Sequence, residues 1–116
     1  MNNAPLFIND QMTPIIISAT SNFGEWIKGL SDESSPLVNK GIMLRYCKEI
    51  QMRTCSIPLD IVFVDRHGFV VKLHKNVQPK APNRFSWRAW HCFELPVGTI
   101  DQYKLIAGSK LELSVL

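Results

Sequence analysis

The sequence predicts a mainly β (α+β) protein, folded as a small antiparallel, partly closed β-barrel or rolled sheet with one or two short helices. Short runs of β-branched and aromatic residues alternate with turn residues along most of the chain. The two segments with helical spacing are too few to alternate with strands as a parallel sheet requires. With 116 residues, 46% of them hydrophobic, the chain has material for one core, and we expect a single domain over 1–116.

The clearest strand signal is a pair of apolar runs, 60–65 and 69–74, on either side of Arg66-His67-Gly68. Two such runs around a glycine-containing turn are typical of a β-hairpin. Apolar residues occupy both faces of the first run, so we expect that strand to be central and covered on both sides. A second pair, 6–8 and 13–19, flanks another tight turn. Pro14 is expected to place the second of these strands near a sheet edge, because proline cannot donate to a ladder.

Further elements are expected along the rest of the chain. A short helix is predicted where Phe23, Trp26, Ile27 and Leu30 recur at helical spacing, and a second over 100–105 with Thr99 as its cap. The remaining strands are expected over 42–46, 87–95 and 110–115. Gly41, just before one of these strands, suggests a close approach of two backbones.

Composition limits the classes of protein that fit. The longest apolar runs fall far short of the roughly 20 residues that a membrane-spanning helix needs, and the first residues lack the features of a secretory signal. Three cysteines cannot all pair within one chain, which favours reduced thiols. We therefore expect a cytoplasmic protein without membrane insertion.

The segment 57–65, Ile-Pro-Leu-Asp-Ile-Val-Phe-Val-Asp, followed by Gly68, resembles the central block of the domain of unknown function 192 family (uncharacterised protein family 0127). The resemblance extends through Met52, 41–44 and 28–30 upstream, and through 93–98 and 105–108 downstream. It implies the fold, but an uncharacterised family implies no activity. The chain departs from the family pattern at 31–33, 53–56 and Ser109, where a ligand site shared by the family would be altered.

The turn before the central strand is the first candidate site, and its candidate ligand-binding residues are Met52, Arg53, Cys55 and Asp60. Pro58 fixes the backbone angle at which the chain enters the strand, so Asp60 is held in a defined direction. The competing interpretation is a structural carboxylate that fastens this turn. Cys55 with a histidine and Asp60 would also supply the residue types of a small acyl-transfer enzyme.

Metal and cofactor motifs do not occur in the sequence. The cysteines and histidines lack the close pairs of a structural zinc site, and His91 and Cys92, adjacent in a predicted strand, should face opposite sides. No glycine-rich phosphate loop or nucleophile elbow is present. We therefore expect no metal and no cofactor, and we favour a protein that is not an enzyme.

The stretch 66–93 contains no acidic residue, and it is the second candidate site. Its candidate anion-binding residues are Lys72, Lys75, Lys80, Arg84 and Arg88, interleaved with Phe85, Trp87 and Trp90. Cations and exposed aromatic rings together are typical of surfaces that bind single-stranded nucleic acid or another polyanion. The alternatives are a solvated strand face with the aromatic residues in the core, or a surface for an acidic protein partner.

The biochemical function stays open at this point. The leading hypothesis is a non-catalytic ligand-binding or accessory domain, with its site between the 52–60 turn and the basic stretch. Polyanion or single-stranded nucleic-acid binding and a small Cys/His/Asp enzyme are the alternatives.

Overall fold

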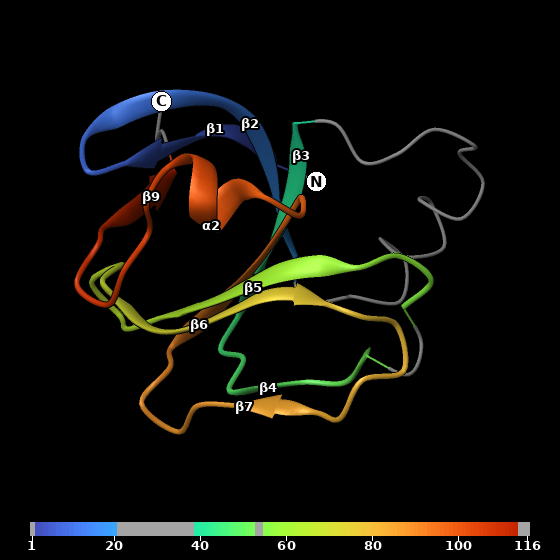
Figure 1. The fold of residues 1–116 in the computed structure, drawn as a ribbon. Helices are drawn as coiled ribbons and strands as arrows, with labels where there is room; N and C mark the ends of the chain where they lie inside the picture. The colour runs from blue at the N-terminus through green and yellow to red at the C-terminus, as the bar shows by residue number, and fades with distance from the viewer. Residues whose placement is uncertain (1, 21–38, 53–54, 114–116) are drawn as a thin grey trace.

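The computed structural model describes residues 2–20, 39–52 and 55–113. Within them, seven strands form one curled sheet with the order β6-β5-β8-β3-β2-β1-β9, and two very short strands form a separate ribbon, β4-β7 (Figure 1). The strands are β1 (Asn2–Ile8), β2 (Gln11–Thr20), β3 (Lys40–Arg45), β4 (Glu49–Ile50), β5 (Leu59–Val64), β6 (Val70–Val77), β7 (Arg84–Phe85), β8 (His91–Leu95) and β9 (Leu111–Leu113), and the helix is α2 (Thr99–Gln102).

The predicted hairpin is confirmed. β5 and β6 are antiparallel neighbours, and the turn between them is held by Asp65, whose Oδ1 accepts hydrogen bonds from the backbone N–H of His67 and Phe69 at 2.8 and 3.0 Å. Gly68 has a φ of 89°, a left-handed conformation that favours glycine. β5 also pairs with β8 and all six of its residues are buried, as expected for a central strand.

The two edges of the curled sheet meet at one end only. The N–H of Val70 donates to Ser109 O, the N–H of Gly108 to Val70 O, and the N–H of Leu111 to Gly68 O, at 2.8 to 2.9 Å. These bonds join the β5–β6 hairpin to the start of β9, on the opposite edge. The barrel is therefore partly closed, as the sequence predicts.

Two hydrophobic cores lie on opposite faces of the sheet. The inner core lies within the curve of the sheet, where α2 packs (Figure 1), and it comprises Leu6, Ile8, Ile15, Ile17, Val62, Val64, Val70, Phe93, Leu95, Ile100, Leu105 and Leu111. The outer core lies on the side of the β4-β7 ribbon, and it comprises Ile42, Leu44, Ile50, Met52, Cys55, Leu59, Ile61, Phe63, Val77, Ala89 and Cys92. Successive residues of β5 and β8 contribute alternately to the two cores, because neighbouring side chains of a strand point to opposite faces.

The N-terminal strand pair is confirmed, but the edge position expected for its second strand is wrong. β1 and β2 are antiparallel, and β2 is an interior strand whose other neighbour, β3, runs parallel to it. The ladder with β3 begins only at Ile16, and the ladder with β1 shifts register opposite Leu6. Pro14 therefore lies on a stretch of β2 that has no partner on one side, which is where proline is tolerated. Gly41 is close-packed as expected, since a Cβ there would lie 2.8 Å from Glu94 O.

Three expected boundaries were wrong or lie outside the described residues. β8 begins at His91 rather than at Trp87, because Ala89 N–H donates to Ser86 O in a turn that precedes the strand. Thr99 does not cap α2: Gly98 holds the cap position, and the Thr99 hydroxyl donates to Pro96 O at 2.6 Å. The helix predicted from Phe23 to Leu30 lies outside the described residues.

Candidate functional site

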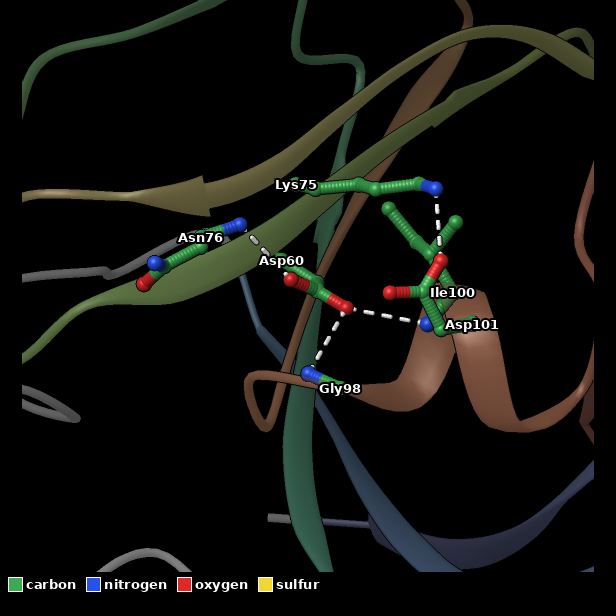
Figure 2. Close-up of polar contacts among 6 residues, drawn as sticks. All are labelled: Asp60, Lys75, Asn76, Gly98, Ile100 and Asp101. Carbon is green, nitrogen blue, oxygen red and sulfur yellow. Dashed lines mark hydrogen bonds and ion pairs between the residues drawn. The ribbon is translucent and has the colours of Figure 1, made fainter.

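Asp60 is a structural carboxylate at the junction of β5, β6 and α2. It is 1% exposed, and its oxygens accept three backbone hydrogen bonds: Oδ1 from Asn76 N–H at 2.8 Å, and Oδ2 from Gly98 N–H at 3.1 Å and Ile100 N–H at 2.9 Å (Figure 2). The latter two are donors at the start of α2 that no helical carbonyl can satisfy. Asp60 therefore caps the helix from a distant strand, and it fastens the segment around Gly98 rather than the 52–56 turn.

The other predicted ligand-binding residues of that turn lie in the outer core. Met52 and Cys55 are buried, and Arg53 lies outside the described residues. The Cys55 thiol donates to Ile57 O at 3.1 Å, and burial raises the pKa of that thiol. Asp60 is thus engaged by backbone groups rather than by a histidine, and burial favours the neutral thiol of Cys55 over the thiolate that a nucleophile needs.

The basic stretch does not form one continuous surface. Lys72 donates to Phe85 O at 2.8 Å on the outer face, whereas Lys75 pairs with Asp101 of α2 at 2.5 Å (Figure 2). Arg84 donates to Pro82 O at 2.6 Å, and Lys80 and Arg88 are exposed. Three of the five predicted cations are thus engaged by the protein itself.

The aromatic residues of the same stretch are exposed. Phe85, Trp87 and Trp90 are 48%, 74% and 44% exposed, so they are not the core residues that the alternative interpretation required. Lys48 donates to Trp87 O at 2.7 Å and to Ala89 O at 2.5 Å. Together with Lys72, this ammonium group fixes the backbone of the 85–89 segment and leaves its rings at the surface.

A hollow of about 370 Å³ opens between the β5–β6 turn and the strands β3, β8 and β9. Its floor is apolar, and its rim carries two arginines and two histidines together with one acid. The lining residues are Met43, Arg45, Val64, Arg66, His67, Gly68, His91, Phe93, Leu111, Glu112 and Leu113. We refer to this set as the mouth hollow.

The electrostatics of the mouth hollow favour an anion. Glu112 is paired with Lys110 at 2.9 Å, whereas Arg45 and Arg66 have no carboxylate partner within the described ranges. The pKa of His91 is lowered, first by burial and then by the Arg45 charge, so the ring is neutral near pH 7. Its Nδ1 accepts the N–H of Tyr46 at 3.3 Å, which leaves Nε2 as the protonated donor.

An aromatic group stands beside the hollow. The Tyr46 ring is 74% exposed and lies with its centroid 5.5 Å from that of Trp90, edge to face, and 5.6 Å from that of His91. Such a group offers an apolar surface next to the cations of the rim.

Sequence reasoning did not single out this site, because its four basic residues come from three segments. Arg45 ends β3, Arg66 and His67 form the hairpin turn, and His91 begins β8. The only local sign of the site was the Arg66-His67 pair in the hairpin turn. A turn of this kind does not need an arginine for its geometry, so Arg66 can have another role. His91 and Cys92 do face opposite sides, as expected from their adjacent positions in a strand, since only His91 lines the hollow and Cys92 lies in the outer core.

The protein is a curled β half-barrel with a basic hollow at its open end. Comparison with known families assigns the chain to one of them. Residues 6–113 match the model of the domain of unknown function 192 family, described as "Uncharacterized ACR". The chain belongs to this family. A search of curated proteins gave no match.

Two solved structures share the fold. One, from Sinorhizobium meliloti 1021, is described as a "putative transcription regulator"; it has a TM-score of 0.79 and 16% identity, over 97% of this chain and 94% of that one. The other is a protein of unknown function from Novosphingobium aromaticivorans DSM 12444, with a TM-score of 0.73 and 20% identity, over 95% of this chain and 84% of that one. At these identities the likeness shows the fold alone.

The described part of the chain has no helix of the length and apolarity that crossing a membrane requires.

Proposed function

We propose that this domain is a non-catalytic binding module whose ligand is a small amphipathic anion, an apolar body with a carboxylate, phosphate or sulfonate group, held in the mouth hollow. The observation that carries the proposal is the combination of an apolar floor with two guanidinium groups, Arg45 and Arg66, that have no carboxylate partner among the described residues. Pockets for small ligands are lined mostly by apolar side chains with a few converging polar groups.

Each part of the ligand has a counterpart in the hollow. Phe93, Leu111 and other floor residues would cover the apolar body, and the Arg45 and Arg66 guanidinium groups would pair with the anionic group, for which their planar donors are suited. His91 would add a neutral N–H donor. The hollow has no nucleophile and no pair of carboxylates among its lining residues, so its chemistry suits binding rather than turnover.

The test uses 8-anilinonaphthalene-1-sulfonate, an aromatic sulfonate whose fluorescence rises when it leaves water. We expect saturable binding to the folded protein at one site, and a loss of at least about tenfold in affinity in the double variant Arg45→Gln/Arg66→Gln, because hydrogen bonds to charged groups contribute roughly 1.5 to 3 kcal/mol each. Affinity should also fall with added salt.

Two controls separate anion recognition from simple apolar contact. Arg88→Gln removes an exposed cation that does not line the hollow, and it should leave the affinity unchanged. N-phenyl-1-naphthylamine, which has the same ring system without the sulfonate, should bind weakly to the parent and equally to the double variant. Equal sulfonate binding by parent and Arg45→Gln/Arg66→Gln proteins would overturn the proposal.

A second candidate function, binding of single-stranded nucleic acid, is favoured by the exposure of Phe85, Trp87 and Trp90 next to Arg84 and Arg88. Exposed rings on a fixed backbone are what base stacking requires. We expect that Trp87→Ala would weaken retention of a thymidine oligonucleotide at low salt without changing the free energy of unfolding, since its ring is 74% exposed.

Testing both variants in both binding assays distinguishes the two candidate functions. Arg45→Gln/Arg66→Gln should impair sulfonate binding alone, and Trp87→Ala should impair oligonucleotide binding alone. An oligonucleotide that is not retained even at low ionic strength would eliminate the second candidate, and the exposed rings would then need another explanation.

A further inference from the structure

Two cysteines from different parts of the chain meet at the border of the outer core. Cys92 lies on β8 and is completely buried, and Cys47 follows the end of β3 and is partly exposed. β3 and β8 are antiparallel neighbours, with Leu44 opposite Cys92. Both cysteines contribute to the same hydrophobic cluster, Cys92 within it and Cys47 packed against it.

The backbone after β3 holds Cys47 in this position. Tyr46 has a φ of 53°, which turns the chain out of the strand, and its N–H donates to the Nδ1 of His91. The N–H of Cys47 then donates to Trp90 O at 3.2 Å. Two successive N–H groups are thus fixed to the two residues that precede Cys92, which holds Cys47 against the cluster that contains Cys92. The Cys47 thiol donates to Glu49 O at 3.2 Å.

The two thiols differ in the way that a reactive pair requires. The neighbouring Cys92 thiol, and then the hydrogen bond to Glu49 O, lower the pKa of Cys47 to about 7, against the opposing effects of burial and of the Glu49 charge. Burial raises the pKa of Cys92 well above its usual value, and the charges of Glu94 and Cys47 act in the same direction. Near neutral pH, Cys47 is therefore divided between the thiol and the nucleophilic thiolate, while Cys92 keeps its proton.

We propose that Cys47 and Cys92 form a thiol-modification site that hydroperoxides oxidise to a reversible intramolecular disulfide. The partly exposed Cys47 is the sulfur that meets the oxidant, and the buried Cys92 is the sulfur that resolves it. This inference is independent of ligand binding in the mouth hollow.

The chemistry balances with the hydroperoxide as the only oxidant. The Cys47 thiolate attacks the outer oxygen of the peroxide, the O–O bond breaks, and the alkoxide or hydroxide that leaves takes up a proton, which gives a sulfenic acid on Cys47. The Cys92 sulfur then attacks the Cys47 sulfur: the S–S bond forms, the S–O bond breaks, and the departing hydroxide leaves as water with the Cys92 proton. Both sulfurs together lose two electrons, and a dithiol reductant restores the pair.

The test treats the reduced, folded protein with hydrogen peroxide at pH 7 and then blocks the remaining thiols under denaturing conditions. We expect the protein to lose two hydrogen atoms in mass, to yield one proteolytic fragment pair linked through Cys47 and Cys92, and to regain both thiols on treatment with dithiothreitol. The third cysteine, Cys55, should stay alkylatable throughout. Chains linked to each other, or a disulfide that includes Cys55, would overturn the proposal.

Variants assign the two roles. Cys47→Ser should prevent any oxidation of Cys92. Cys92→Ala, or Cys92→Ser if the alanine variant does not fold, should let a sulfenic acid accumulate on Cys47, where dimedone traps it, and should form no disulfide. Cys55→Ser is the matched control and should oxidise like the parent protein.

A pH profile adds a measurement that does not depend on peroxide. Iodoacetamide should alkylate Cys47 of the native parent at least about tenfold faster than Cys55 at pH 7, with a midpoint near pH 7 that moves to higher pH in Cys92→Ala. The carboxyls whose charges act on the pair, Glu49 and Glu94, are unchanged in that variant. Equal rates for Cys47 and Cys55 would contradict an activated thiolate.

Discussion

Two buried carboxyl groups lie on neighbouring strands, Asp60 on β5 and Glu94 on β8, and their surroundings differ. Asp60 faces the end of β6 and the start of α2, where three backbone N–H groups reach its oxygens. Glu94 is 0% exposed, and neither of its oxygens has a hydrogen-bond partner in the part of the chain that the structure describes. Burial, and then the Cys47 charge, raises the pKa of Glu94 well above its usual range.

The two carboxyl groups point to opposite faces of the sheet. Phe93 and Leu95 point to the inner core, so Cys92 and Glu94, which alternate with them along β8, point to the outer face. His74, which contacts Phe63 of the outer core, also has an Nε2 without a partner among the described residues. The carboxylate near α2 is thus fastened by backbone donors, whereas Glu94 and the Nε2 of His74 on the outer face have no hydrogen-bond partner among the described residues.

The largest effect is expected for Asp60→Ala. Three backbone donors lose their acceptor, at least one of them fully buried, so the variant should lose about 3 kcal/mol in the free energy of unfolding, measured by urea denaturation. Asp101→Ala, which removes an exposed carboxylate of α2, is the matched control and should cost far less. Equal midpoints for the two variants would show that Asp60 does not fasten α2.

Glu94→Gln should have the opposite sign. A carboxyl whose folded pKa is raised contributes its stability fully below its unfolded pKa, near 4.3, and loses it as pH rises toward the folded pKa. In that window the parent should lose about 1.4 kcal/mol per pH unit relative to Glu94→Gln, and the two proteins should converge near pH 4. Denaturation at a series of pH values tests this.

The control for that experiment is Glu49→Gln, at an exposed position of β4, whose stability should follow the parent over the acidic part of the series. A parallel response of Glu94→Gln and the parent would mean that the pKa of Glu94 is the same in the folded and the unfolded protein.

A smaller effect is expected for Lys48→Met on the outer face. Its ammonium group donates to Trp87 O and Ala89 O, so the variant should lose about 1 kcal/mol and increase the mobility of Trp87. Fluorescence anisotropy of single-tryptophan proteins that retain only Trp87 would report this directly. Unchanged anisotropy would show that the 85–89 segment does not depend on this lysine.

The smallest effect is expected for Lys75→Met. Lys75 and Asp101 are both well exposed, so their ion pair is screened by water and salt. The denaturation midpoint should hardly move, and any change should vanish at high salt. A large loss of stability would mean that α2 is held by this pair as well as by Asp60.

The sequence was sufficient for the parts of the fold that depend on local pattern. The β5–β6 hairpin, the central position of β5 and the close approach at Gly41 follow from alternation, turn residues and glycine. The parallel pairing of β2 with β3 and the β4-β7 ribbon could not be predicted, because partner choice between distant strands leaves no local signal. The Thr99 cap failed for the same reason, since Asp60 of β5 satisfies the helix N-terminus.

The candidate sites depended even more on tertiary contacts. Asp60 was a candidate site residue from its position after Pro58, but its partners, Asn76, Gly98 and Ile100, lie 16 to 40 residues away. The predicted cations Lys72 and Lys75 share one strand but lie three residues apart, so alternation places them on opposite faces, Lys72 on the outer face and Lys75 toward α2. Their separation could therefore be read from the strand pattern, whereas the groups that they contact, Phe85 O and Asp101, could not.

The pairing of β1 with β9 has a consequence for synthesis in the cell. The outer ladder of β1 pairs Leu6, Phe7 and Ile8 with Leu113, Glu112 and Leu111 of β9. The first strand of the described chain can therefore complete its pairing only when the last strand has been made. During translation the outer edge of β1 stays open while the other strands emerge, and an open apolar edge can template pairing with another chain. The outer edge of β1 is therefore covered only after β9 has left the ribosome, and it is an edge that a chaperone could shield until then.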